Sequence, residues 1–108
     1  MPNTYTNAKK YLTGTSVTTL YTAPALTTSI VKSILVSEDS GNADTITVTI
    51  TDTAASPATF SVFKTKSISA NGTAELLTAP LVMKTGEILK VTAATANRLH
   101  VVASILEV

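Results

Sequence analysis

The sequence offers few side chains that could carry out acid–base or nucleophilic chemistry. His100 is the only histidine in the 108 residues, and there is no cysteine. A catalytic histidine needs an orienting acid and a nucleophile within hydrogen-bond reach. His100 instead lies among aliphatic residues, in a pattern that predicts a half-buried position on a strand. Serine and threonine are abundant, but no G-x-S-x-G turn is present to activate one of them. We therefore expect a protein that is not an enzyme.

A group of oxygen-bearing side chains has the chemistry, but not the spacing, of a Ca²⁺ site. Glu38, Asp39, Asn42 and Asp44 fall within one expected loop, and Ca²⁺ prefers oxygen ligands from such loops. The spacing departs from the D-x-[DN]-x-[DN]-G pattern, because the alternate positions after Asp39 are glycine and alanine. We interpret this segment as a solvated turn. Since the sequence also has no P-loop and no dinucleotide-binding fingerprint, we expect no metal and no cofactor.

Basic and aromatic residues interleave near the N-terminus, at Tyr5, Lys9, Lys10 and Tyr11. Such groups can bind single-stranded nucleic acid, but two lysines are too few for that role. We interpret them as part of an interface with a partner, in which tyrosine is the amphipathic anchor. Residues 1–8 lack a strand pattern and are expected to form an N-terminal arm, while residues 9–108 form a single domain.

The composition predicts a protein that associates with partners. Charged residues make up 14% of the chain, against roughly 25% in ordinary soluble domains, so little charge repulsion opposes contact between molecules. The alternative is a monomer whose threonine-rich strands face water, since threonine is also a good strand former. The formal net charge of +1 argues against binding nucleic acid. No apolar stretch is long enough to span a membrane as a helix, so we expect no membrane partner.

Alternation of aliphatic and hydroxylated residues predicts strands along the whole chain. Residues 44–52 are the clearest case, because every second residue is aliphatic and the residues between them are threonines. Residues 29–37 are more evenly apolar, which predicts a strand covered on both faces. Residues 97–107 alternate again, with one face made of Leu99, Val101, Ala103 and Ile105 and the other of Arg98, His100, Val102, Ser104 and Leu106. The threonines that share one face are Thr45, Thr47, Thr49 and Thr51, and we expect their hydroxyls to face a neighbouring subunit.

Shorter strand candidates and turn signals fill the rest of the sequence. About eight short strands separated by proline and glycine predict an all-β fold, an antiparallel β-sandwich with jelly-roll or Ig-like connections. Periodicity does not choose between those two topologies. The further strands are expected at residues 10–13, 17–22, 59–64, 67–69, 73–77 and 87–93, with turns at Ser40-Gly41-Asn42 and Thr85-Gly86. Asn71-Gly72 is expected to form a type I′ hairpin turn, because both residues tolerate a positive φ.

Several strand–turn segments from Leu20 onward carry a family resemblance. They are Leu20–Pro24, Thr28–Ile34, Ser40–Asp44, Leu81–Thr92 and the terminal Ala96–Glu107. On these segments the sequence resembles small structural proteins of tailed-bacteriophage virions, which look like β-sandwiches that cement or decorate capsids. The sequence departs from this pattern at Ala25-Leu26, which stand where a glycine is expected soon after Pro24.

The resemblance implies a virion subunit that binds and stabilises the shell of the major capsid protein after assembly in the host cytoplasm. It also implies a homo-oligomer with cyclic symmetry, with a trimer as the expected form. An alternative places the sandwich in the phage tail, as a baseplate, adaptor or fibre-attachment subunit. A carbohydrate-binding module for host attachment is a weaker alternative. Such sites usually stack sugars on exposed aromatic rings, and this chain has no tryptophan and only 5% aromatic residues.

Overall fold

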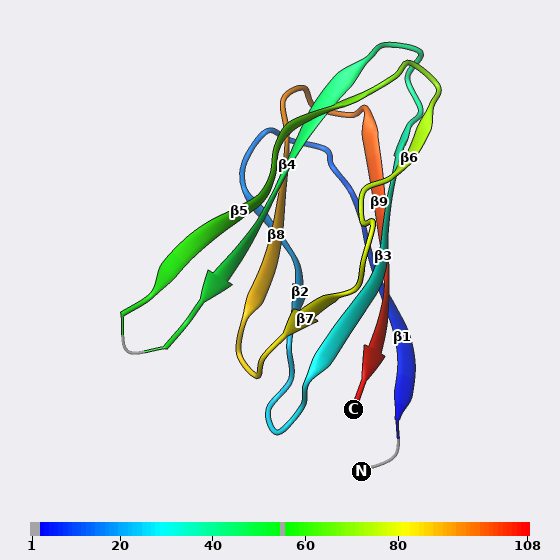
Figure 1. The fold of residues 1–108 in the computed structure, drawn as a ribbon. Coiled ribbons are helices and arrows are strands. Elements are labelled where there is room, and N and C mark those ends of the chain that lie inside the picture. The colour runs from blue at the N-terminus through cyan, green and yellow to red at the C-terminus, as the bar shows by residue number, and fades with distance from the viewer. Residues whose placement is uncertain (1–2, 55) are drawn as a thin grey trace.

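The alternating side chains build nine strands and no helix in the part of the chain that the computed structural model describes, residues 3–54 and 56–108 (Figure 1). The all-β, antiparallel architecture predicted from the sequence is therefore confirmed. The strands are β1 (Thr4–Tyr11), β2 (Thr18–Thr22), β3 (Ser29–Glu38), β4 (Asp44–Asp52), β5 (Ala58–Ile68), β6 (Thr73–Glu75), β7 (Leu81–Met83), β8 (Ile88–Ala93) and β9 (Leu99–Glu107).

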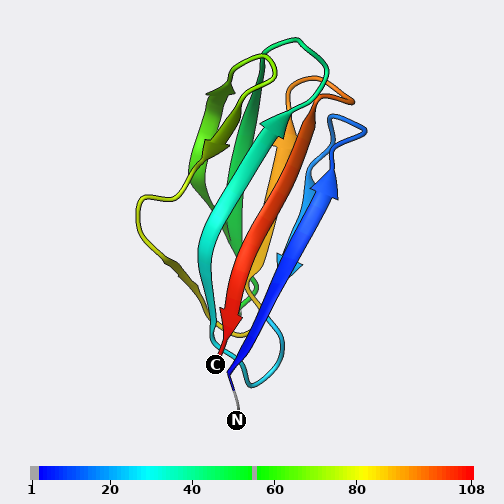
Figure 2. The same ribbon diagram turned by 90° about the vertical axis from the view of Figure 1, so that its right-hand side faces the viewer.

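The strands form two antiparallel sheets that pack face to face. Sheet A has the order β1-β9-β3-β6, and β7 pairs with β3 on the same side as β6. Sheet B has the order β2-β8-β4-β5. Figure 2 looks onto sheet A, in which β3, β9 and β1 run side by side in front of sheet B. Most neighbouring strands are distant in sequence, so tertiary pairing decides which residues become adjacent on each face.

The core lies between the sheets and is made by the aliphatic half of each alternating strand. Ile46 and Val48 of β4 are fully buried, as their alternation with threonine predicts. On β9, Leu99, Val101 and Ala103 are buried in the same way. Because burying one such aliphatic side chain contributes about 1.5–3 kcal/mol, this set determines which face of each strand turns inward.

Strand β3 differs from the expectation that residues 29–37 are covered on both faces. Its inward residues Val31, Ile34 and Val36 are buried, but Leu35 on the outer face is 40% exposed. Two layers are present among the described residues, and sheet A has a neighbour on its inner side alone. An evenly apolar strand therefore has one face open to solvent.

Residues 59–64 and 67–69, expected as two strands, form the single strand β5. Two register shifts against β4 bend this strand, and Thr65 at one of them has a φ of 49°. An extra residue in one strand of a pair increases the local twist and turns the strand away from its neighbour. The three-residue strand β7 was not predicted, because so short a segment carries no periodicity.

The N-terminal segment is not a separate arm where the structure describes it. Strand β1 pairs with β9 in one unbroken register from Thr4↔Glu107 to Tyr11↔His100. The expected boundary between residues 8 and 9 therefore falls inside a strand. Ala8 also packs against the core, and this contact, with the ladder hydrogen bonds, holds the segment on sheet A. The first two residues of the expected arm lie outside the described residues.

A buried carboxylate organises one end of the sandwich, which we call the loop end (residues 38–44 and 69–73). Glu38 is only 3% exposed. Burial alone would raise the pKa of Glu38, but the hydrogen bonds outweigh it and lower this pKa to about 2. The donors are the hydroxyl of Ser40 and the backbone N–H groups of Ser40, Gly41, Asn42 and Asn71.

The loop end contradicts two expectations from the sequence. The solvated turn was wrong for Glu38 and for Asp44, which is buried and accepts a hydrogen bond from the N–H of Thr95. The Asn71-Gly72 turn is not a type I′ hairpin turn, because only Asn71 has a positive φ, of 55°. It joins β5 of sheet B to β6 of sheet A, so it crosses between layers and does not connect paired strands.

Candidate partner interface

The predicted interface residues lie on two opposite sides of the sandwich. Tyr5, Lys9, Lys10 and Tyr11 belong to β1, an edge strand of sheet A. The four threonines at positions 45, 47, 49 and 51 belong to β4, in the middle of sheet B. The structure does not bring the two sets together, so each surface has to be considered separately.

Strand β1 presents most of its predicted residues on the outer face of sheet A. Side chains alternate along a strand, and Ala8 packs against the core. Tyr5, Lys9 and Tyr11 therefore share the outward side. The Lys10 side chain is on the same side of β1 as Ala8, but it is exposed because β1 is at the open edge of the sheet.

Cross-strand neighbours extend this face into an apolar row. Tyr5 pairs with Leu106 of β9, which pairs in turn with Ile30 of β3. Ile30 then pairs with Val82 of β7. The two ends of the row are open, since Tyr5 is 75% and Val82 57% exposed. Side chains directly opposite on one face contact each other, so the four strands present a continuous apolar line.

A second row on the same face combines a lysine with two aliphatic residues. Lys9 pairs with Val102, and Val102 pairs with Leu35. Leu35 and Val102 are both large and partly exposed, at 40% and 38%. The sequence indicated that Val102 and Leu106 turn away from the core, but it did not single out Leu35, Ile30 or Val82. Only the strand order makes these residues neighbours.

An aromatic stack lies at the loop end of β1. The rings of Tyr11 and His100 are 4.4 Å apart and nearly parallel, and Nε2 of His100 lies 3.6 Å from a carboxylate oxygen of Asp39. His100 is half-buried on a strand, as predicted. The His100 ring stacks on Tyr11 and holds it at the surface. The one histidine of the chain, which is the side chain most suited to catalysis, therefore makes a structural contact.

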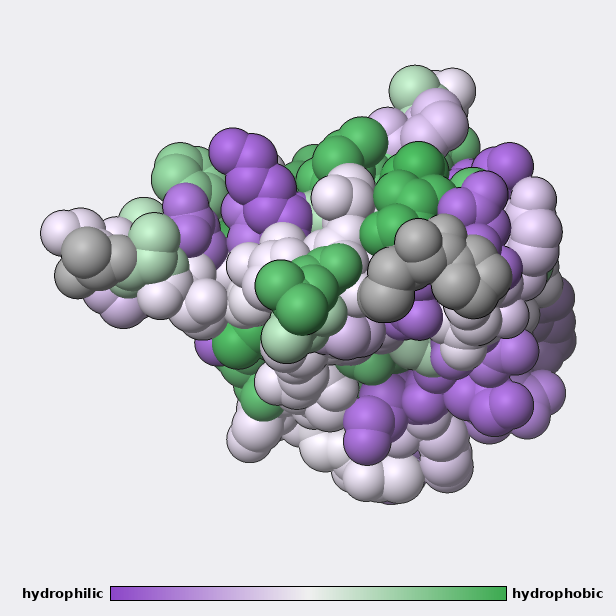
Figure 3. Space-filling view, turned by 90° about the horizontal axis from the view of Figure 1, so that it is seen from below, coloured by the Kyte–Doolittle hydropathy of each residue, from purple (hydrophilic) through white to green (hydrophobic). Residues whose placement is uncertain are grey.

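Two shallow hollows open beside β1. One is lined by the Lys9–Tyr11 segment and His100, and the other by the Tyr5–Asn7 segment, Lys32 and Ser104. Figure 3 views the end of the molecule at which the chain termini lie, and hydrophobic surface there forms patches between hydrophilic side chains. The outer face of sheet A and its β1 edge thus combine shallow hollows, rows of apolar side chains and lysines, which are the usual components of a binding surface.

The threonine face of sheet B is less available than the sequence suggests. Thr51 is buried, and its hydroxyl lies 3.0 Å from that of Thr59 on β5. The hydroxyl of Thr47 accepts a hydrogen bond from the N–H of Thr65. Thr45 and Thr49 are half-buried between neighbouring strands. Two of the four predicted hydroxyls therefore serve contacts within the sheet.

The acidic and the basic side chains differ in the contacts that they make within the described residues. All seven aspartate and glutamate side chains bond to or pair with another described residue. Glu75 is typical: burial alone would raise its pKa, but hydrogen bonds from Ser33, Ile34 and Leu77 lower it. None of the seven lysines forms an ion pair with another described residue. The side chains that lack an ion-pair partner within the described residues therefore include all seven lysines.

The described residues show no other kind of site. Within residues 3–54 and 56–108, no three side chains of His, Asp or Glu are grouped so that they could hold a metal ion. The same part of the chain forms no helix with the length and apolar character needed to cross a membrane. Comparison with models of known protein families finds no match to this sequence, and comparison with curated proteins finds no similar protein.

Proposed function

We propose that this chain is a structural subunit of a tailed-bacteriophage virion that binds the shell of the major capsid protein as a cement or decoration protein. The resemblance of the segments Leu20–Pro24, Thr28–Ile34, Ser40–Asp44, Leu81–Thr92 and Ala96–Glu107 to such proteins suggests the class. Two properties of the folded chain support the proposal: its strand order and its outer surface.

The strand order supports a jelly-roll topology, which occurs in viral capsid proteins. Strands β6 and β7 lie along the same side of β3 and act as one interrupted strand. The two sheets then have four strands each, β1-β9-β3-β6/β7 facing β2-β8-β4-β5. This arrangement is that of two interlocked Greek keys, and it favours the jelly roll over the Ig-like alternative.

The outer face of sheet A is the observation that carries the proposal. It presents apolar residues of four strands in register, and the lysines near them have no ion-pair partner within the described chain. A surface of this kind fits an acidic, partly apolar partner. A subunit that binds only the assembled shell adds its binding free energy to the stability of that shell, and modest contacts suffice because many copies act together.

The copy number in purified particles of the encoding phage tests the proposal. Hundreds of copies per particle, located on the head by immunogold labelling, are expected for a subunit that follows the shell lattice. About a dozen copies or fewer, located on the tail, would overturn the capsid assignment and favour a baseplate, adaptor or fibre-attachment subunit. A low copy number on the particle, together with binding to a glycan array, would favour the carbohydrate-binding alternative for host attachment.

A pair of variants tests which surface binds. Leu35→Glu should abolish binding to shells assembled without this protein, because it places a negative charge in the second row of sheet A, opposite an acidic partner. Thr49→Glu makes the corresponding change on the opposite face and should leave binding unchanged. Loss of binding with Thr49→Glu alone would restore the threonine face as the interface.

A further inference from the structure

Three of the four sheet edges are interrupted. Strand β2 has a register shift between Thr19 and Tyr21. Strand β5 has two shifts, a positive φ at Thr65, and a lysine on each side of that residue. The third edge is split into β6 and β7, three residues each. Bulges, short strands and lysines are the means by which proteins stop a sheet edge from pairing with another chain.

Strand β1 is the exception. Its eight residues pair with β9 without a register shift. Within the described residues, the β1 backbone makes no hydrogen bond to any element other than β9. Figure 2 shows β1 at the open side of sheet A. One row of its N–H and C=O groups therefore faces solvent over a length sufficient to bind another strand.

We propose that β1 pairs antiparallel with β1 of a second copy of this chain, about a two-fold axis at Asn7, and so joins two A sheets into one. In such a pair, side chains stay on their own faces only if odd-numbered residues oppose odd-numbered ones. Asn7 then opposes Asn7 of the second copy, and Tyr5 opposes Lys9 of the second copy.

The side chains of β1 favour a second copy in this register. Tyr5 is 75% exposed, and Lys9 forms no ion pair with a described residue, so each lacks a partner that the other supplies. An ammonium group over an aromatic ring is attracted to it, and the symmetric contact forms twice. Lysine does not oppose lysine at any position. Tyr11, by contrast, is already stacked on His100.

Pairing in this register would join the rows on the outer face. The apolar row that ends at Tyr5 would continue into Lys9, Val102 and Leu35 of the second copy. The two-fold contact is isologous and closed, so it yields a dimer and not a fibre. This inference does not depend on the virion assignment, because it concerns the free protein.

A single cysteine tests the register, since the chain has none of its own. Asn7→Cys should form a disulfide-linked dimer under mild oxidation, visible on a non-reducing gel. Thr19→Cys, on the interrupted β2 edge, should stay monomeric on the same gel. Cross-linking at Ala8→Cys with none at Asn7→Cys would overturn the register.

The unmodified chain tests the contact itself. Analytical ultracentrifugation should report a dimer, and Asn7→Lys should weaken it at least about tenfold by opposing like charges at the axis. Ser104→Lys is the matched control, because Ser104 is exposed and lies opposite Asn7 on β9, away from the edge. A monomer, a trimer, or a dimer equally sensitive to both substitutions would overturn the proposal. None of these measurements needs a phage particle, so their failure is distinct from failure of the proposed function.

Discussion

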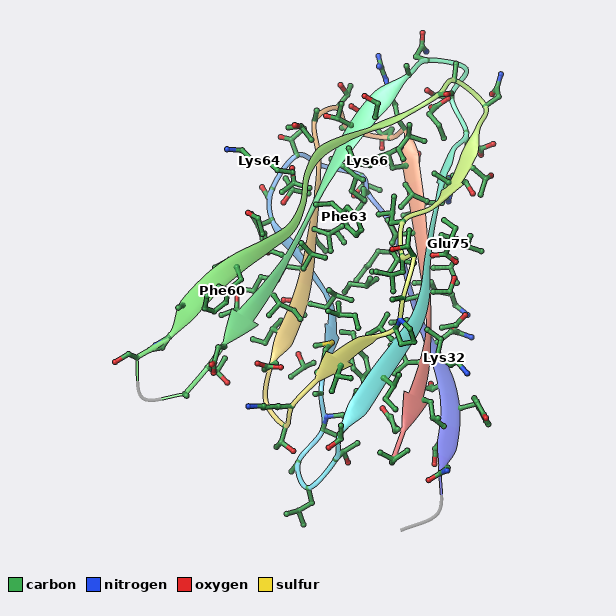
Figure 4. All side chains as sticks on the ribbon, viewed as in Figure 1. Lys32, Phe60, Phe63, Lys64, Lys66 and Glu75 are labelled. Carbon is green, nitrogen blue, oxygen red and sulfur yellow. The ribbon has the colours of Figure 1, made fainter. Side chains whose placement is uncertain are left out.

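The loop end and the β4–β5 hairpin differ in how backbone regularity relates to burial. Irregular segments surround a buried side chain at the loop end, whereas a regular strand of the hairpin carries an exposed one. At the loop end, Glu38 accepts five hydrogen bonds and is 3% exposed, although all of the donors lie in loops between strands. The hairpin continues the most regular strand of the molecule, yet Phe60 on it is 58% exposed. Figures 1 and 4 show the hairpin extending away from sheet A, with Phe60 beyond Phe63 along β5.

The difference shows that regular alternation and tertiary cover are separate properties. Phe60 pairs with Ile50, so it faces the core side of sheet B, but sheet A does not reach that far. An irregular loop can be rigid when one buried acceptor collects its free N–H groups. A regular strand is exposed when no second layer lies opposite it.

Glu38→Gln should cause the largest loss of stability. Its amide removes the negative charge and turns an N–H₂ group toward backbone N–H donors, which leaves buried groups without partners. Thermal unfolding followed by circular dichroism should show the Tm several degrees lower. Asp39→Asn, in the same loop with an exposed side chain, should leave the Tm nearly unchanged. Equal shifts for the two variants would show that Glu38 does not hold the loop end.

Acid should act through the same carboxylate. The pKa of Glu38 is about 2 in the folded chain, against 4.5 without the fold. Its contribution to stability is therefore complete above about pH 4.5 and is lost as the pH falls toward about 2. The pKa of Glu75 is lowered as well and acts in the same direction. Urea unfolding across this range should show stability falling, with a smaller fall in Glu38→Gln. An equal fall in both proteins would assign the acid sensitivity elsewhere.

Phe63→Ala should cost about 2 kcal/mol, roughly half the loss from truncating a fully buried phenylalanine. Phe63 is half-buried and packs against the core at the base of the hairpin. Chemical denaturation monitored by circular dichroism measures the change. If Phe63→Ala lost less stability than Phe60→Ala, the outer part of the hairpin would be more deeply buried in solution than its base.

Tyr21→Phe should cost about 1 kcal/mol through lost hydrogen bonds and should remove an alkaline transition. The hydroxyl of Tyr21 donates to Glu107 and lies 2.7 Å from the hydroxyl of Ser29, so it ties sheet B to sheet A at the end opposite Glu38. Burial and the bond to Glu107 raise the pKa of Tyr21 to about 12, from 10.0. Stability is then complete below about pH 10 and is lost as the pH rises toward about 12. A variant that loses stability over this range as the parent does would exclude Tyr21 as the cause.

Phe60→Ala should have the smallest effect, less than about 1 kcal/mol. Its ring is mostly in solvent, so truncation leaves no cavity. The same denaturation experiment serves as the measurement. A loss as large as that of Phe63→Ala would indicate that a second copy covers the hairpin in solution.

The strands themselves could largely be predicted, because alternation is local. Residues 44–52 match β4 at both ends, and the buried residues of β9 are those that the pattern pointed inward. Strand β1 was mistaken for an arm because its residues are mixed and exposed, so they show no clear alternation. The bulges of β5 were missed because they depend on the neighbouring strand β4.

The candidate site was predictable only in part. Tyr5, Lys9 and Tyr11 do lie on one outward face, but nothing in the sequence pattern indicates that Leu106, Ile30 and Val82 are their neighbours. Those residues are separated by up to about one hundred positions along the chain and meet only through the order β1-β9-β3-β7. The threonines of β4 were expected to face a partner, but hydroxyl contacts within sheet B occupy two of them.

The amino-acid sequence alone determined the all-β class, the antiparallel two-layer body and the inward residues of its clearest strands, since alternation between two faces is a property of each strand by itself. Only the tertiary structure decided which strands stand at the edges, which outward residues form rows and which carboxylates are buried. Those outcomes depend on the order of strands in each sheet, and hydrogen bonds between distant segments establish that order.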